Sequence, residues 1–307
     1  MAHVAPKVSI GLPVFNGDQF LEEALDSILA QTFTDFELII SDNASTDRTA
    51  EICRAYAARD PRIRYQCNAS NIGGANNGNL TFRLSRGQYF RWAAHDDVCA
   101  PHLIEKCVQD LDNDPALVLS YSQTIDIDEK GDVITKKKIR LGEADTPHQR
   151  LLEISNRNHY CEVGYGLIRS DVLKATRLVQ SYTDSDRTLL CELCLHGKFH
   201  QVQEPLFYKR HHPKNAYWDW RTRMAWFDEK LVGKIVLPYW MQLMDFFVTV
   251  HRVPLSIGEK ARCYLVVLGP IIFRSWRELL SDVKFALTLT FHSVAWRKKR
   301  YAETMNW

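Results

Sequence analysis

The first part of the chain alternates between two patterns of hydrophobic and polar positions. The apolar run at residues 8–14 predicts a buried strand, and apolar positions from Phe20 to Leu29 recur at helical spacing. The same alternation predicts later strands, with helices between them, at 36–40, 62–66, 89–93 and 117–121. Alternating strands and helices favour right-handed crossovers, and they predict an α/β fold with a mostly parallel sheet.

Beyond about residue 123 the pattern changes. Residues 123–140 are typical of a charged hairpin with its turn at 129–132, and helix and strand signals continue to Tyr208. The remainder is rich in Trp, long apolar residues and basic residues. We therefore expect a second structural half and then a helical tail.

Composition narrows the functional classes. With 307 residues, 46% of them hydrophobic and 25% charged, the chain is typical of a globular protein. Its net charge of +2 does not favour nucleic-acid binding. Residues 1–7 contain no apolar signal segment, and the C-x-x-C pair Cys191 and Cys194 lies among leucines, where cysteine packs as a small core residue. We expect a cytoplasmic protein with reduced thiols.

Polar clusters follow three of the expected strands, at Asn16–Asp18, Asp42–Asn43 and His95–Asp97. Ligands of parallel α/β sheets bind beyond the carboxyl ends of the strands, so these clusters predict one binding site. The alternative for each acid is a helix cap. For Asp42 the two alternatives are a contact to a base or ribose and a cap of the next helix.

Asp96 and Asp97 are adjacent carboxylates after a buried strand. Like charges at this range raise each other's pKa, and a cation relieves the repulsion. Mg²⁺ or Mn²⁺ bound through one or two carboxylates and substrate phosphates fits this pattern. The neighbouring strand-end clusters favour a metal site over a solvated capping pair.

The turn after the first strand argues against three other classes of protein. It reads Pro13-Val14-Phe15-Asn16-Gly17-Asp18 and lacks the G-x-G-x-x-G of dinucleotide-binding oxidoreductases. The P-loop pattern does not occur in the chain. The turn also lacks the Gly-rich loop with a basic residue that is expected of a sugar-phosphate nucleotidyltransferase.

Residues 8–52, which begin VSIGLPVFNGDQF and include ELIISDNASTD, resemble the opening of the family 2 inverting glycosyltransferases, which have the GT-A fold. The resemblance is dense over 7–125 and recognisable to about 215. It implies a nucleotide-diphosphate sugar donor, with a UDP-sugar favoured, and Mn²⁺ or Mg²⁺ as cofactor. It also implies transfer to a glycan or lipid-linked acceptor in cell-surface polysaccharide synthesis.

The resemblance assigns roles to particular residues of the first half. The residues it implies for donor binding are Pro13, Val14, Phe15, Asn16, Asp42, Asn71, Gly73 and Asp96, and Asp97 is the implied metal ligand. The family's Asp-x-Asp-Asp run reads Ala94-His95-Asp96-Asp97 here, so the first acid is lost. His95 then either replaces it as a donor contact or packs at the strand end.

The segment TDSDRTLLCELCLHGKFHQVQEPLFYKRHHP resembles the acidic stretch, helix, strand and R-x-H run of the same family. Asp186 aligns with the catalytic base, and Asp184 is the alternative. Arg210 is implied to stabilise a loop. His212 is implied to contact metal or diphosphate, with His211 as the competing choice.

The resemblance implies a GT-A catalytic domain over 1–215, with a donor half at about 1–122 and an acceptor half at 123–215. A helical region follows at 216–307. Its longest uncharged stretches are too short to span a bilayer, but with the basic run Arg297–Arg300 they suit a peripheral contact with the inner face of the plasma membrane. The alternatives are helices that cover the catalytic domain or form a homodimer.

Because Ala94 replaces an acid, a non-enzymatic relative that binds a sugar nucleotide stays open as a second interpretation.

Overall fold

A computed structural model describes residues 5–137, 140–156, 161–212, 227–228, 231 and 234–290. The strands are β1 (Val8–Val14), β2 (Phe36–Asp42), β3 (Ile63–Cys67), β4 (Tyr89–Trp92), β5 (Val98–Cys99), β6 (Leu117–Ile127), β7 (Val133–Lys137), β8 (Leu167–Arg169) and β9 (Lys198–Arg210). The helices are α1 (Leu21–Leu29), α2 (Thr49–Arg59), α3 (Gly74–Arg83), α4 (Leu103–Asn113), α5 (Pro147–Ile154), α6 (Ser170–Ala175), α7 (Ser185–His196), α9 (Pro238–Arg252), α10 (Ile257–Val266) and α11 (Ile272–Thr290). Two further turns are the 3₁₀ helix η1 (Glu162–Tyr165) and the π-helical turn η4 (Val267–Ile271).

The described strands form one nine-stranded sheet in the order β3-β2-β1-β4-β8-β6-β9-β5, with β7 paired to β6. Strands β1 to β4 pair in parallel, as the alternating pattern predicts. Every residue of β2 is buried, which is typical of a parallel strand covered on both faces. The parallel ends of β1, β2 and β4 therefore open at one edge of the sheet, where the polar clusters lie.

The second half of the sheet is mixed. Strand β8 pairs antiparallel with both β4 and β6, whereas β9 runs parallel to β6. The hairpin expected at 123–140 is present as β6 and β7, and its turn is closed by a hydrogen bond from the Asp128 amide to the Asp132 carbonyl, 2.9 Å long. Strand β6 extends to Ile127, beyond the expected end at 121, because β9 pairs along it.

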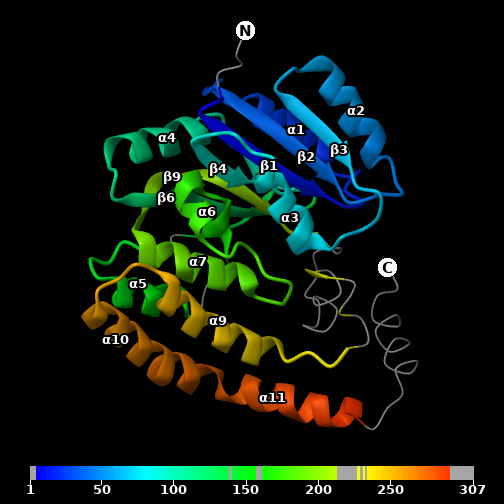
Figure 1. The fold of residues 1–307 in the computed structure, drawn as a ribbon. Coiled ribbons are helices and arrows are strands. Elements are labelled where there is room, and N and C mark those ends of the chain that lie inside the picture. The colour runs from blue at the N-terminus through cyan, green and yellow to red at the C-terminus, as the bar shows by residue number, and fades with distance from the viewer. Residues whose placement is uncertain are drawn as a thin grey trace.

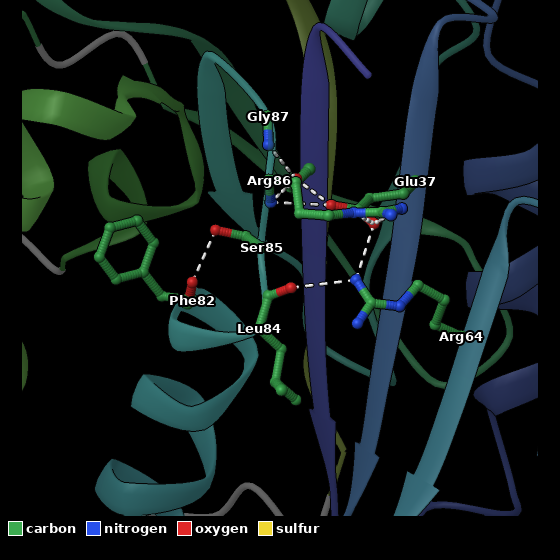
Figure 2. Close-up of polar contacts among 8 residues, drawn as sticks. Glu37, Arg64, Phe82, Leu84, Ser85, Arg86 and Gly87 are labelled. Atoms are coloured by element: carbon green, nitrogen blue, oxygen red, sulfur yellow. Dashed lines mark hydrogen bonds and ion pairs between the residues drawn. The ribbon is translucent and has the colours of Figure 1, made fainter. Parts of the chain in front are cut away.

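A buried carboxylate links the strands at the opposite edge of the sheet. Glu37 is 3% exposed, and Arg64 and Arg86 bring their guanidinium groups within 2.9 and 2.7 Å of its carboxylate, as Figure 2 shows. The Ser9 hydroxyl donates to the same carboxylate at 2.7 Å. Burial raises the pKa of Glu37, but the hydrogen bonds from Arg86, Ser9 and Arg64 outweigh it and lower the pKa below its ordinary value.

Helices α9, α10 and α11 lie on the side of the molecule away from β1–β3, next to α5 and α7 (Figure 1). Leu243 and Val250 of α9 share one hydrophobic cluster with Leu190 of α7 and Leu119 of β6. The domain boundary predicted near 215 lies outside the described residues. Of the residues described, none belongs to a helix that is long and apolar enough to cross a membrane.

The two cysteines of the C-x-x-C pair are free and fully buried on α7. Both contribute to the same hydrophobic cluster. The prediction that they pack as core residues is therefore confirmed.

A candidate active site between the strand ends and helix α7

The turn after β1 is joined to the turn after β2 by hydrogen bonds. Asn16 has a left-handed backbone (φ 49°), its amide donates to the Ser45 hydroxyl, and its side-chain carbonyl accepts from the Thr46 amide, both at 2.9 Å. Phe15 is 40% exposed beside this junction. Of the residues predicted to bind the nucleotide, Asn16 thus ties the turn after β1 to the turn after β2, and Phe15 is exposed beside them.

Asp42 is fully buried at the end of β2. One carboxylate oxygen accepts from the Ser45 amide at 2.9 Å, and the other accepts from the Tyr65 hydroxyl at 3.0 Å. The sequence leaves a cap and a donor contact as alternatives for this residue, and both oxygens bond to the protein in this structure. Each oxygen can accept a second hydrogen bond, so a contact from Asp42 to a base or ribose would require access to this buried carboxylate and not the loss of either bond.

Asn71 and Gly73 lie next to these turns. The Asn71 side-chain carbonyl accepts from Asn43 at 2.6 Å and from the Gly73 amide at 2.8 Å. Gly73 has φ +85°, and a side chain there would collide with the backbone carbonyl of Phe227. Glycine is therefore required where two stretches of backbone meet beside the predicted donor pocket.

His95 packs against Gly17, where any side chain would collide with the imidazole ring. The structure thus places His95 against the turn after β1, and a contact from this side chain to the donor stays a prediction.

Asp96 and Asp97 are each 7% exposed. Burial raises the pKa of Asp97 well above its ordinary value, and the charge on Asp96 raises it further. One Asp97 oxygen accepts from the Arg210 amide at 2.9 Å. Two buried acids thus lie side by side at the end of β4, with a strong electrostatic preference for positive charge nearby.

His212, and not His211, faces this acid pair. Its Nε2 lies 3.0 Å from an Asp96 oxygen, while its buried Nδ1 has no hydrogen-bond partner among the described residues. The His211 ring turns the other way and lies 3.2 Å from Asp126. The structure therefore separates the two neighbouring histidines by position, and the role of His212 stays a prediction.

Arg210 is 1% exposed and connects three segments around the acid pair. Its Nε donates to the Asp96 carbonyl at 2.9 Å, Nη1 donates to the carbonyls of the β6–β7 turn, and Nη2 lies 2.6 Å from Glu23 of α1. Its guanidinium also lies over the Phe20 ring at 4.7 Å. Arg210 is thus a buried link between the strand end, the hairpin turn and α1.

A hard divalent cation fits the acid pair, because burial and mutual repulsion both oppose two negative charges there. Within the described residues, no group of three or more His, Cys, Asp or Glu side chains is arranged as a metal site. Mg²⁺ and Mn²⁺ sites commonly use one or two protein carboxylates, with phosphates and water as the other ligands. The acid pair is a candidate for such a site.

Asp186 lies in the first turn of α7. Asp184, directly before this helix, has a left-handed backbone with φ 65°. Burial raises the pKa of Asp186, and the charge on Asp184 adds to this effect, although Arg187 opposes it. The Cys161 thiol also lowers the pKa of Asp186, but less than Arg187 does. A carboxylate with a raised pKa is a stronger base, which suits proton abstraction.

Tyr165 connects the two acidic groups. Burial raises its pKa well above the ordinary value, and the charges on Asp97, Asp96 and Asp186 raise it further. The 3₁₀ helix η1, which ends at Tyr165, contacts both β4 and α7. The fold therefore brings the segments that lead to the strand-end acids and to the α7 acid together at η1, although about ninety residues separate these acids in sequence.

A buried charged network beside Tyr165 was not predicted from the sequence. Glu162 accepts from Lys137 at 2.7 Å and from Lys209 at 3.2 Å, and Lys137 also lies 3.0 Å from Asp126. Burial raises the pKa of Glu162, but Lys209 and Lys137 lower it below the ordinary value. The sequence signal that could have revealed this network is the set of charged residues in β6, β7 and β9. Charged side chains that are buried in a sheet generally need a partner of opposite charge.

A family model described as "Glycosyl transferase family 2" matches residues 9–176, more than half of the chain. Chondroitin synthase from Escherichia coli is 34% identical over 130 residues, which cover 42% of this chain and 19% of that protein. Glycosyltransferase GlyG from Streptococcus pneumoniae is 30% identical over 112 residues, covering 36% and 37%. The matches thus span less than half of each of these relatives.

Solved structures resemble the chain over most of its length. TarS from S. aureus in complex with UDP-GlcNAc matches with a TM-score of 0.66 and 13% identity, covering 92% of this chain and 81% of that chain. The mannosyltransferase PcManGT from Pyrobaculum calidifontis, in complex with GDP-Man and Mn²⁺, matches with a TM-score of 0.53 and 14% identity, covering 99% and 86%. At such identities the likeness shows the fold alone, and it confirms the predicted GT-A fold.

Proposed function

Since this chain belongs to glycosyl transferase family 2, we propose that it is an inverting glycosyltransferase. Its donor is a nucleotide-diphosphate sugar, with a UDP-sugar favoured, and its acceptor is a hydroxyl group of a glycan or lipid-linked intermediate of a cell-surface polysaccharide. The observation that carries the proposal is the contact of η1 with both β4 and α7, which brings the strand-end acids and the α7 acid to one region of the fold. The charges on Asp96, Asp97 and Asp186 all raise the pKa of Tyr165 in η1. The first two acids suit the diphosphate side of the donor, and the third suits the acceptor.

Different residues of the chain have different roles in the reaction. Asp186 accepts the proton of the acceptor hydroxyl, whose oxygen forms a bond to the anomeric carbon as the bond from that carbon to the diphosphate oxygen breaks. Because attack occurs opposite the leaving group, the configuration inverts. The raised pKa of Asp186 supports its role as base. The turns at Asn16 and Asn71 bind and orient the nucleotide.

Asp97 would bind Mn²⁺ or Mg²⁺, with His212 as a second ligand. The cation, when bound, stabilises the negative charge that develops on the leaving diphosphate. Arg210 keeps Asp96 and Asp97 in position, because its amide and its guanidinium both bond to this pair.

We also propose that residues 1–215 form the catalytic domain and residues 216–307 a helical region. The protein is cytoplasmic, with peripheral contact to the inner face of the plasma membrane. The basic run Arg297–Arg300 supports this contact, and it lies outside the described residues.

Replacing Asp186 by Asn tests the central assignment. We expect transfer to fall about 10²–10⁴-fold, since the general base is lost, while donor affinity is nearly unchanged. Nucleoside diphosphate release measures the first quantity, and calorimetric titration of donor measures the second. Asp171→Asn on the surface of α6 serves as the matched control. A collapse of donor affinity in Asp186→Asn would contradict the role of base.

The second interpretation is an inactive relative that binds sugar nucleotides. Hydrolysis of donor by the wild-type chain without acceptor, stimulated by Mn²⁺, would exclude it. Donor binding with neither transfer nor hydrolysis would support it.

A further inference from the structure

Helix α11 presents a continuous apolar stripe to solvent. The exposed fractions of its members are 78% for Phe273, 48% for Trp276, 49% for Leu280, 39% for Val283 and 58% for Leu287. Their spacing alternates between three and four residues, which aligns them on one side of a helix. On an adjoining side of the helix, Leu279 is buried and shares a hydrophobic cluster with Leu243 and Val250 of α9. Burial within the described fold therefore does not explain the outer stripe.

Basic residues follow this stripe along one flank. Arg274, Arg277 and Lys284 are exposed and each directly follows a stripe residue. The guanidinium of Arg277 lies over the ring of Trp276 at 5.3 Å. The acids of the helix do not offset these charges at the surface, because Asp282 is fully buried and Glu278 is half-buried.

Asp282 explains why the helix keeps this orientation. Its carboxylate accepts from the Tyr239 amide at 2.8 Å and from the Trp240 amide at 3.3 Å, at the start of α9. The Trp240 indole donates to the Leu279 carbonyl at 3.0 Å. These bonds set the rotation of α11 on α9, and so they set which side chains face outward.

We propose that the outer face of α11 is a docking surface for an anionic lipid bilayer, with the apolar stripe in the headgroup region and the three cations on lipid phosphates. Aromatic and aliphatic side chains beside Lys and Arg are the composition of helices that lie in a membrane interface. A second copy of the chain fits less well, because two-fold pairing through this face would bring the same uncompensated cations of both copies together.

Flotation of the full chain with lipid vesicles tests the surface. We expect binding to vesicles of phosphatidylcholine mixed with phosphatidylglycerol and little binding to phosphatidylcholine alone. The triple variant Arg274→Gln, Arg277→Gln, Lys284→Gln should lose on the order of a hundredfold in partitioning, about fivefold for each cation. The control Arg54→Gln, Arg59→Gln, Arg83→Gln removes equal charge from exposed positions of α2 and α3 and should bind as the wild type does.

The double variant Phe273→Ser, Leu280→Ser tests the apolar stripe. It should abolish vesicle binding, while its thermal unfolding midpoint stays within a few degrees of the wild-type value. Equal binding to both kinds of vesicle, or unchanged binding of the triple variant, would overturn the proposal. A wild-type dimer that dissociates on the Ser substitutions and ignores vesicles would overturn it in favour of self-association. Vesicle binding needs no donor, so its outcome is independent of sugar transfer.

Discussion

Asp184 and Asp186 are two acids at the start of α7, and the charge of one influences the other. Removing the charge in Asp184→Asn should lower the pKa of Asp186, because that charge raises it. Since the base must be deprotonated, the acid limb of the profile of kcat against pH should move to lower pH. The profile of Asp171→Asn should stay in place. If the acid limb of the Asp184→Asn profile does not move, a group other than Asp186 controls it.

Glu37 is expected to matter for stability and not for catalysis. Glu37→Gln should reduce the free energy of unfolding by roughly 2 kcal/mol, less than for a fully buried pair, because Arg64 and Arg86 are about half exposed. With a lowered folded-state pKa, the stabilisation is present above the unfolded-state pKa of about 4.3 and is lost as pH falls through the folded-state pKa.

Denaturant unfolding of Glu37→Gln and of Glu51→Gln, an exposed acid on α2, measures this difference. Equal stability of the two variants at neutral pH would show that the Glu37 cluster contributes little.

Helix α9 is expected to position the candidate base although it lies outside the residues that resemble the family. Gln242 donates to the Asp184 carbonyl at 3.0 Å. Asp245 accepts from the Tyr182 hydroxyl at 2.7 Å and pairs with Arg177. The left-handed turn that leads into Asp186 is therefore bonded to a helix that follows it by more than fifty residues.

Gln242→Leu and Asp245→Asn should lower kcat roughly tenfold to a hundredfold by displacing the base, with donor affinity unchanged. Met244→Gln, on the exposed side of the same helix, is the control. If kcat falls only in proportion to the fraction unfolded, measured by circular dichroism, α9 has a stabilising role alone.

The whole molecule should be stabilised by its donor nucleotide. Thermal unfolding with UDP, GDP or dTDP, with and without Mn²⁺, identifies the nucleobase of the donor. A ligand that binds only the folded state adds about 2.7 kcal/mol to the free energy of unfolding at a hundredfold excess over Kd. We expect a rise with UDP that depends on Mn²⁺ and is lost in Asp97→Ala but kept in Asp171→Ala. No rise with any nucleotide would contradict the donor site and favour Asp96 and Asp97 as a cap.

The local pattern of the sequence was enough for the first half of the fold. The pattern predicted β1 to β4 within one or two residues. The signal was clearest for β1 and β2, because strands buried on both faces require nearly continuous apolar sequence. The charged hairpin was recognisable because its turn contains Gly131, and this residue has φ +90° in the structure. Strand β5, with two residues, gave no periodic signal, and only its pairing with β9 defines it.

The candidate site depended on both the sequence and the tertiary structure. The strand-end acids were identifiable from residue type and position, whereas the acid at α7 was assigned only through the family resemblance. The family match confirms the class of protein to which these acids were assigned, and their individual roles stay predictions. Three features could not be read from the chain: the contact of η1 with both β4 and α7, the different partners of His211 and His212, and the bonds from α9 to the Asp184 turn. They join residues far apart in sequence, and only long-range packing sets their distances and burial, on which their pKa values and chemistry depend.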